Sequence, residues 1–358
     1  MAIAATAAVV FAGVSLGLAF TMGGKSKTLT RTGCMVAPFP PLNDHSFNQA
    51  VFDGLTDAGT TWGVSVRNRV TDPPSETAAK ENLEAFAKQR CGLVVSVGQF
   101  MAPTTADVAR RYPDVKFLTT DDPKNRRLEN LASVKFEVDQ AAFLAGYLAA
   151  GTTRTGKVAT FGGMPTSTVD PFLRGFAAGV LRYNVEHATN VELVGWDLPT
   201  QTGLYVTGDT SDLGVFEDSR RAAALTDHLI KSGADVIMPV DGPGGAVGAG
   251  NAARASRKPV LLIGVDADQF YSTPQFSDLW LTSVLKVYRR MVYFAMGEEV
   301  LGRFEPGRIS GTLANGGVEL APFHQLRTRV PARLRNEIRK LERHIQDGSI
   351  SLDPASYV

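Results

Sequence analysis

The chain has 358 residues, of which 44% are hydrophobic and 20% charged, and 37 basic against 36 acidic residues leave a net charge of +1. This length allows two domains, each with a core that needs no metal or disulfide to fold. The near-zero charge excludes the broad basic field that gathers nucleic acid. Two Cys and five scattered His leave no zinc-type spacing. We therefore expect no nucleic acid, metal or cofactor.

The first 22 residues carry no charged side chain. Such a run is long enough to span a bilayer and also resembles the core of a signal peptide. Lys25, Lys27 and Arg31 follow it, and the positive-inside rule would then place the body in the cytoplasm. Because processing of this segment would remove that conflict, we nevertheless expect residues 1–24 to be a signal peptide or membrane anchor. The body would then lie at the outer face of the cell membrane. The alternative of a buried N-terminal helix is disfavoured, since Gly23-Gly24 and a polar stretch separate the run from the rest.

From residue 33 onward, short apolar runs alternate with segments of helical periodicity. Most of the runs are β-branched and continuously apolar, which is typical of strands with helices on both faces. The alternation indicates parallel sheets built from βαβ units, an α/β fold. The predicted strands are 34–37, 64–70, 93–97, 115–120, 134–136, 158–161, 191–196, 236–240, 261–265 and 281–285.

About ten strands are too many for one sheet of ordinary size, so the sequence predicts two lobes. The polar segment 151–156 is the expected break between them. Pro331 is a good first position for a helix that ends near Gly348. Its apolar stripe indicates an amphipathic surface helix over 331–350, formed by Leu334, Ile338, Leu341 and Ile345.

The segment 44–49 directly follows the first predicted strand. Ser46 and Gln49 fit a capping box, so a helix should begin there, at the carboxyl end of a parallel strand where open α/β sheets bind ligands. Phe47 and Asn48 would lie beside the free N–H groups of that helix. The alternative is an ordinary capped helix with Phe47 in the core. A hydrolase triad of Asp44, His45 and Ser46 is disfavoured, because consecutive side chains diverge.

A glycine-rich turn, 242–250, follows Asp241 at the end of another predicted strand. Glycine lets backbone approach a ligand closely. The turn resembles a dinucleotide fingerprint, and Asp266 lies at a suitable distance, but the spacing Gly242-x-Gly244-x-x-x-Gly248 differs from that motif. It indicates a ligand-facing turn more firmly than it indicates NAD.

Asp266 and Asp268 close the next strand, and Lys286 follows the strand after it. A carboxylate accepts two hydrogen bonds at once, which suits the vicinal hydroxyls of a sugar, and Lys286 would add a cationic donor. The alternative is a surface ion pair of little energetic value. A metal would need a third convergent ligand, which this segment does not offer.

Cys34 and Cys91 lie at the starts of the first and third predicted strands. In the doubly wound order 2-1-3 these strands are neighbours, about 4.8 Å apart, which is within reach of a disulfide. An exported body favours the oxidised pair. Two buried free thiols are the alternative.

Ordered motifs along residues 34–350 together resemble the basic membrane protein family of substrate-binding lipoproteins, which includes the purine-nucleoside receptors of ABC transporters. They are Asp44-x-Ser-Phe-Asn-Gln49, Tyr112-Pro-Asp-Val-Lys-Phe117 leading to Asp121, Ala141–Ala150, Thr155-Gly-Lys-Val, Phe161-Gly-Gly163, Phe172-x-x-Gly-Phe176, Phe216-Glu-Asp218, Gly233–Ile237, Gly264-Val-Asp-x-Asp-Gln269, Thr282–Lys286 and Gly311–Val318.

The resemblance implies a type I periplasmic-binding-protein fold, with two Rossmann-like lobes, three crossovers and a ligand cleft between the lobes. The implied bounds are 33–153 with 287–308 for one lobe and 154–286 with 309–330 for the other. It also implies a ligand site in which Phe47 and Phe216 sandwich a base. Asn48 and Asp121 match polar positions near the base, and Gly242, Asp266 or Asp268, and Lys286 match the ribose side. Asp44, which opens the first motif, is a further expected ligand-binding residue.

The sequence departs from the family pattern at several positions. Pro40-Pro41 replaces a common Gly-Gly, no lipobox is present, and Asp241 stands where a small residue is usual, next to the implied ribose site. A buried carboxylate there would demand a basic or hydroxyl-rich ligand.

The resemblance predicts a monomeric, non-catalytic receptor that delivers a nucleoside-like molecule to an ABC permease. A membrane-tethered sensor is the alternative, and a dehydrogenase that uses the 242–248 turn is the third hypothesis.

Overall fold

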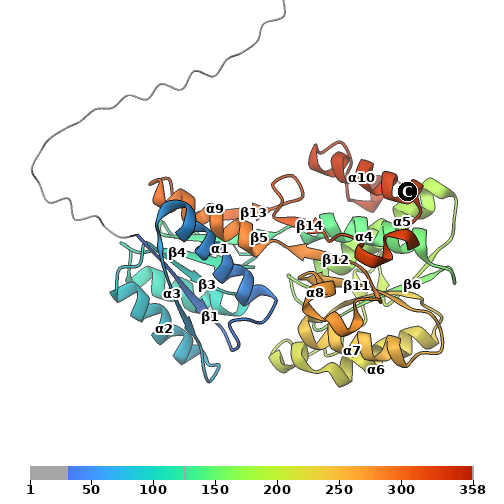
Figure 1. Cartoon of the computed structure of the whole chain (residues 1–358), viewed down its shortest axis with the longest axis horizontal. Helices are drawn as coiled ribbons and strands as arrows, with labels where there is room; N and C mark the ends of the chain where they lie inside the picture. The colour runs from blue at the N-terminus through green and yellow to red at the C-terminus, as the bar shows by residue number, and fades with distance from the viewer. Residues whose placement is uncertain (1–30, 125, 357–358) are drawn as a thin grey trace, which may run out of the picture. The chain divides into compact units, whose positions relative to one another are not determined.

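The computed structural model describes residues 31–124 and 126–356 (Figure 1), which contain two six-stranded sheets and the helices that cover them. The predicted signal peptide or anchor, 1–24, lies outside these residues. Among the described helices, none has the length and apolar character needed to cross a membrane.

The first sheet has the order β2-β1-β3-β4-β5-β13, and every neighbouring pair in it is parallel. We call this sheet and the helices packed on it lobe I. α1 and α9 lie side by side on one face, and α2 and α3 cover the other (Figure 1). The elements are β1 (32–37), α1 (47–62), β2 (65–70), α2 (76–88), β3 (93–96), α3 (102–111), β4 (116–120), β5 (131–136), α9 (288–300) and β13 (307–311).

The second sheet repeats the same order as β7-β6-β10-β11-β12-β14, except that β14 pairs antiparallel with β12. We call it, with its helices, lobe II. α4 and α5 pack on one face, and α6 and α7 on the other. The elements are α4 (138–152), β6 (157–162), α5 (170–187), β7 (192–194), β8 (196–197), β9 (202–203), α6 (219–231), β10 (236–240), α7 (242–255), β11 (261–266), α8 (269–272), β12 (280–286), β14 (318–320) and α10 (332–346).

The chain passes between the lobes three times: after β5, after β12 and between β13 and β14. The crossing segments are hydrogen-bonded to one another, because the Glu137 amide donates to the Gly311 carbonyl and the Val287 amide to the Gly317 carbonyl, both at 2.8 Å. This arrangement confirms the two-lobe α/β fold expected from the resemblance.

The first crossing lies elsewhere than the sequence predicts. α4 packs on α5 and β12 of lobe II, so the chain leaves the first sheet at Glu137 and not at the polar segment 151–156. β13 extends to Gly311 in lobe I, beyond the expected bound at 308. An almost wholly apolar helix such as α4 does not reveal in its sequence which of two sheets it covers.

All ten predicted strands are present, and three strands were not predicted: the short β9, which pairs with β8, and the edge strands β13 and β14. The two edge strands come from the glycine-rich stretch 307–320, which lacks the long apolar runs of interior strands. The predicted strand 191–196 is divided at Gly195, which has φ +94° and backbone so close to Thr160 that a Cβ would lie 2.0 Å from its carbonyl oxygen. The terminal helix α10 buries the predicted stripe of Leu334, Ile338, Leu341 and Ile345.

The two cysteines are joined by a disulfide, with their Cα atoms 6.1 Å apart. Cys34 lies in β1 and Cys91 just before β3, and both side chains are buried in the core that α2 and α3 form on the sheet. The covalent link thus ties β1 to the residue that leads into the neighbouring strand β3.

Candidate functional site

Lys286 joins the two lobes. It ends β12 in lobe II, and its ammonium lies 2.8 Å from Asp121 Oδ2, at the end of β4 in lobe I. The same ammonium lies 3.0 Å from Asp266 Oδ1, at the end of β11. Only 6% of the lysine side chain is exposed, against 14% for Asp121 and 23% for Asp266. Three predicted site residues thus form one ion-pair cluster at the carboxyl ends of parallel strands.

Burial and charge pairing shift the pKa values of residues in this cluster. Burial opposes the charge on Lys286, but Asp121 and Asp266 outweigh that cost and raise its pKa above the ordinary value. Burial raises the pKa of Asp121, and Lys286 counters the shift. The Tyr288 hydroxyl donates to Asp121 Oδ2 at 3.4 Å, and burial raises the pKa of this phenol. At neutral pH the cluster therefore holds a charged lysine and a neutral tyrosine, both donors.

The backbone at this cluster is held in an unusual conformation. Asp121 has φ +60° and Asp266 has φ +66°, in the left-handed region that side chains with a Cβ rarely adopt. Such residues persist where the surrounding structure fixes them, and they concentrate at functional sites. The strain turns both carboxylates out of their strands and toward Lys286.

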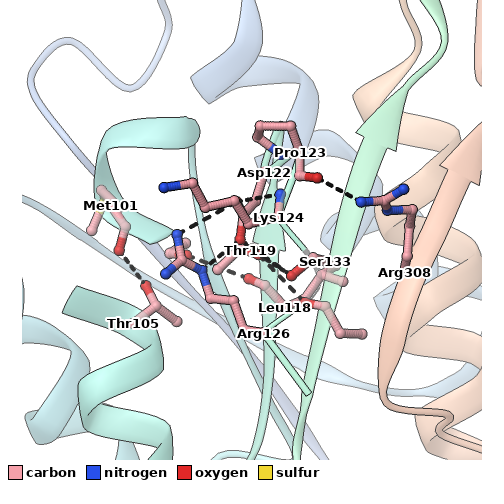
Figure 2. A network of polar contacts seen from close by, with 12 residues as sticks. Met101, Thr105, Leu118, Thr119, Asp122, Pro123, Lys124, Arg126, Ser133 and Arg308 are labelled. Carbon is pink, nitrogen blue, oxygen red and sulfur yellow. Dashed lines mark hydrogen bonds and ion pairs between the residues drawn. The ribbon is translucent and has the colours of Figure 1, made fainter. Parts of the chain in front are cut away.

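A second carboxylate, Asp122, fixes the loop behind Asp121 (Figure 2). Its Oδ2 accepts from Arg126 Nε at 2.8 Å, its Oδ1 accepts from the Lys124 amide at 3.1 Å, and the Ser133 hydroxyl of β5 donates to it at 3.3 Å. Arg308 of β13 donates to the Pro123 carbonyl at 2.7 Å. Asp122 is therefore occupied by hydrogen bonds within lobe I, whereas the adjacent Asp121 pairs with Lys286.

Asp44 caps helix α1, in place of the predicted capping box. Its carboxylate accepts from the amides of Ser46, Asn48 and Gln49 at 2.8–3.1 Å, whereas the Ser46 hydroxyl makes no cap hydrogen bond. The Gln49 side chain donates to Asp53 instead of reaching back. Burial raises the pKa of Asp44, although the three amides favour its charged form. The helix begins at the predicted residue, with a different capping group.

Asn48 is fully buried on the first turn of α1. Its amide nitrogen donates to the carbonyls of Phe39 and Pro41 at 3.1 and 3.2 Å. Its oxygen Oδ1 has no hydrogen-bond partner among the described residues. The side chain therefore anchors the loop after β1 and keeps one acceptor unengaged.

Two half-buried rings occupy the predicted sandwich positions, one in each lobe. The Phe47 ring lies edge-on to Phe39, with centroids 5.7 Å apart, and 6.5 Å from Tyr288. Phe216 lies in a short 3₁₀ turn, 213–217, with its ring 6.4 Å from that of Phe100 in lobe I. Phe100 is 46% exposed and was not predicted from the sequence. The aromatic pair across the lobes here is Phe100 with Phe216.

Gly242 and Asp241 lie beside Phe216. Gly242 has φ +59°, and a Cβ on it would meet the Phe216 side chain at 3.1 Å. A Cβ on Gly163, after β6, would lie 2.2 Å from Asp241 Oδ1 and 2.9 Å from Phe216 Cε1. The glycines at these strand ends thus make room for the ring and the carboxyl group.

Asp268 is separated from Lys286 by its own partners. It accepts from the Phe270 amide at 3.2 Å and lies 2.8 Å from His324 Nε2, and the His324 ring stacks on Phe270 at 4.0 Å. The sequence left open whether Asp266 or Asp268 belongs to the cluster, and the geometry favours Asp266.

Two surface grooves lie away from this cluster. One, of about 400 Å³, is lined by 192–197 and 202–204, and the other, of about 510 Å³, lies between α1 and α9 beside Tyr293 and Phe294. Neither contains a predicted site residue. The candidate site therefore lies at the ion pairs of Lys286, where strand ends from distant parts of the sequence meet.

The chain is similar to several known proteins in sequence and fold. The chain is 25% identical to a Lactococcus lactis protein named ABC transporter nucleoside-binding protein BmpA, over 98% of this chain and 97% of that one. It is 26% identical to basic membrane protein A of Borreliella burgdorferi, over 75% and 72% of the two chains. The fold matches a solved ABC transporter solute-binding protein from Aeropyrum pernix with a TM-score of 0.72 and 26% identity, over 90% and 92% of the chains.

The family model described as ABC transporter substrate-binding protein PnrA-like matches residues 34–197 and 206–350, which is most of the described chain. The chain therefore belongs to the family of PnrA-like ABC transporter substrate-binding proteins.

Proposed function

We propose that this substrate-binding protein takes up a nucleoside-like small molecule between its two lobes and presents it to an ABC permease. The observation that carries the proposal is the cluster of Lys286, Asp121 and Asp266, which draws groups from both lobes to one point. A relative that aligns over nearly its full length bears the name nucleoside-binding protein.

The chemistry of the cluster suits a ribose. Vicinal hydroxyls donate well to a carboxylate, and the Asp266 carboxylate faces the same point as the Lys286 ammonium. A hydroxyl that bonds to Asp266 also offers its lone pairs to Lys286. A ligand without these hydroxyls would leave buried charged groups unsatisfied, which a polar site penalises strongly.

The aromatic residues suit a base. Phe47 and Phe216 come from different lobes, and both are half-buried. Phe47 lies beside Tyr288 of the ion-pair cluster, and Phe216 lies beside the ends of β6 and β10. Stacking of a base on one aromatic ring contributes about 1–3 kcal/mol. The two rings would therefore add affinity only when the lobes are close together.

Binding would be linked to a hinge at the three crossing segments. The lobes are in direct contact in this structure, because Lys286 pairs with Asp121 and the Ser272 hydroxyl donates to the His45 carbonyl at 2.7 Å. A ligand that enters must replace these contacts with its own, so opening precedes entry and closing follows it.

We propose that the protein acts as a monomer at the outer face of the cell membrane, held by or processed from residues 1–24. The disulfide between Cys34 and Cys91 supports export, since disulfides persist in oxidising compartments. The names of relatives such as basic membrane protein A support the membrane. A tethered sensor would share these properties, and the discriminating observation is whether a permease and an ATPase are encoded nearby.

The first test is a thermal-shift screen of residues 31–358 with nucleosides, free bases, sugars, amino acids and NAD. A ligand that binds only the folded state raises the melting temperature. A shift with inosine, adenosine or guanosine, and none with the free bases, would support the proposal. A shift with NAD alone would favour the dehydrogenase hypothesis instead.

The ribose assignment has its own test in Asp266→Ala. We expect this variant to lose its discrimination between ribosides and free bases, because the hydroxyl acceptor is gone. The matched control is Asp268→Ala, whose carboxylate is bonded to His324 and α8. Equal losses of riboside and free-base affinity in Asp266→Ala would count against the assignment.

A further inference from the structure

Asp241 is a buried acidic residue whose carboxyl group lacks hydrogen-bond partners among the described residues. It ends β10 and is 0% exposed, and neither of its carboxyl oxygens has a hydrogen-bond partner among the described residues. Buried carboxyl groups are normally hydrogen-bonded, and an unpartnered one costs free energy. An unpartnered carboxyl group at this place is therefore a candidate for a functional role.

Asp241 lies at a position where its side chain would normally find hydrogen-bond donors. Asp241 is the N-cap residue of helix α7, where an Asp side chain usually accepts from the first amides of the helix. Here the side chain makes no cap hydrogen bond. Its Oδ1 is directed instead at Gly163, on the neighbouring strand end, beside the ring edge of Phe216. The carboxyl group thus accepts no hydrogen bond from the helix amides, and it lies beside the ring that is proposed to stack on the base.

The charged groups that act on Asp241 are not those of the Lys286 cluster. Burial raises its pKa to about 8, Arg221 lowers it, and Asp218 and Glu217 raise it further. Arg221 is itself paired with Asp212 and Asp218. Desolvation and the Asp44 carboxylate of lobe I raise the pKa of Glu217. The Phe216 end is therefore rich in carboxyl groups, with its nearest cation already engaged.

We propose that Asp241 selects the ligand by accepting a hydrogen bond from an amino group on the ring that stacks against Phe216, and that it disfavours rings with no donor at that edge. This inference rests on the proposed nucleoside function and narrows it to amino-bearing nucleosides. A ligand amino group would supply the partner that the carboxyl oxygens lack within the protein.

The experiment compares pairs of ligands that differ in one amino group. Adenosine is set against purine riboside, and guanosine against inosine, by calorimetry with the wild type, Asp241→Ala and Asp241→Asn. For the wild type we expect at least tenfold preference for the amino member in one pair, and at most about threefold in Asp241→Ala. Asn keeps one acceptor of similar shape, so Asp241→Asn should retain part of the preference. Asp227→Asn is the control, since Asp227 pairs with Lys231 on an exposed face of α6 and does not act on Asp241.

A pH series adds a second readout. The ionised carboxylate is the stronger acceptor, so the wild-type preference should rise between pH 6 and pH 9, and stay level in Asp241→Asn. Glu217, Asp218 and Arg221 face the same group and are present in both proteins, so their titration cancels in the comparison.

The two proposals fail in different ways. If the wild type binds nucleosides but its amino preference is the same in both Asp241 variants, the selection role is overturned and the receptor function stands. If the wild type binds none of the four nucleosides, the nucleoside function is overturned, and the selection role with it. Melting temperatures of the variants distinguish a lost contact from a lost fold.

Discussion

Lys286 Nζ lies 2.8 Å from Asp121 Oδ2 and 3.0 Å from Asp266 Oδ1, so one ammonium from lobe II holds a carboxylate of each lobe. Its charge is also 5.2 Å from the ring centre of Phe172, on helix α5. This cation links the two lobes, and in the proposed function it would also donate to a ligand. The two roles would compete, as the proposed opening and closing of the lobes requires.

Substitution of Lys286 by Met should lower riboside affinity at least tenfold and reduce stability by about 3–5 kcal/mol, because removal of one partner leaves buried carboxylates unpaired. Calorimetry and urea unfolding measure the two effects. Lys231→Met is the matched control, because Lys231 pairs with Asp227 on an exposed face. A Lys286→Met protein with full affinity would remove this residue from the site.

Phe216→Ala should weaken nucleoside binding at least tenfold while the melting temperature stays within a few degrees, since the ring is only half-buried in a short 3₁₀ turn. Fluorescence titration with a nucleoside gives the affinity. Phe294→Ala, at a ring 53% exposed in the remote groove between α1 and α9, should leave affinity unchanged. Unchanged affinity in Phe216→Ala would exclude the ring from the sandwich.

Asp241 should make the folded protein less stable as the pH rises. Its pKa is raised by burial to about 8 in the folded state from the ordinary value of 3.8, so between these values the folded state holds a proton that the unfolded state has lost. The stability it contributes is fully present below pH 3.8 and falls by at most about 1.4 kcal/mol per pH unit until pH 8.

Urea unfolding of the wild type and Asp241→Asn at pH 5, 7 and 9 checks this. The stability of Asp241→Asn relative to the wild type should increase from pH 5 to pH 8 and then level off. Parallel pH profiles for the two proteins would contradict the buried, unpartnered state of this carboxyl group.

Gly163→Ala should impair ligand binding through its neighbours, because the new Cβ would lie 2.2 Å from Asp241 Oδ1 and 2.9 Å from Phe216 Cε1. We expect a stability loss of about 1–3 kcal/mol from overpacking and a loss of affinity beyond it. Gly208→Ala is the control, since a Cβ there meets nothing within 4 Å. Equal behaviour of the two variants would show that the strand end tolerates the added volume.

Reduction of the disulfide between Cys34 and Cys91 should cost about 4 kcal/mol by the chain-entropy model, given their separation of 57 residues. Urea unfolding with and without dithiothreitol measures the loss. The double variant Cys34→Ala/Cys91→Ala provides the control, because its stability should not respond to the reductant.

Much of the fold could be predicted from the sequence, because interior parallel strands are continuous apolar runs. β13 and β14 were missed because edge strands carry polar and glycine residues. The position of α4 was missed for the opposite reason, since its helix is apolar on nearly every face and fits either sheet.

The candidate site was predicted in part, because strand ends can be read from the sequence. Which of two neighbouring acids faces the site could not be read in this way. Asp121 and Asp122 differ only in backbone dihedral and partners, and so do Asp266 and Asp268. Phe100 and Tyr288 lie in ordinary helical patterns, and only the packing of the lobes brings them to the site.

Because the chain crosses between the lobes three times, lobe I is completed late during synthesis. Lobe I obtains helix α9 and strand β13 from residues 288–311, after the whole of β6 to β12 has been made. A growing chain thus carries an open edge on β5 until residue 311 is available. The first lobe to be synthesised therefore reaches its full structure only after the strands β6 to β12 of lobe II have been made.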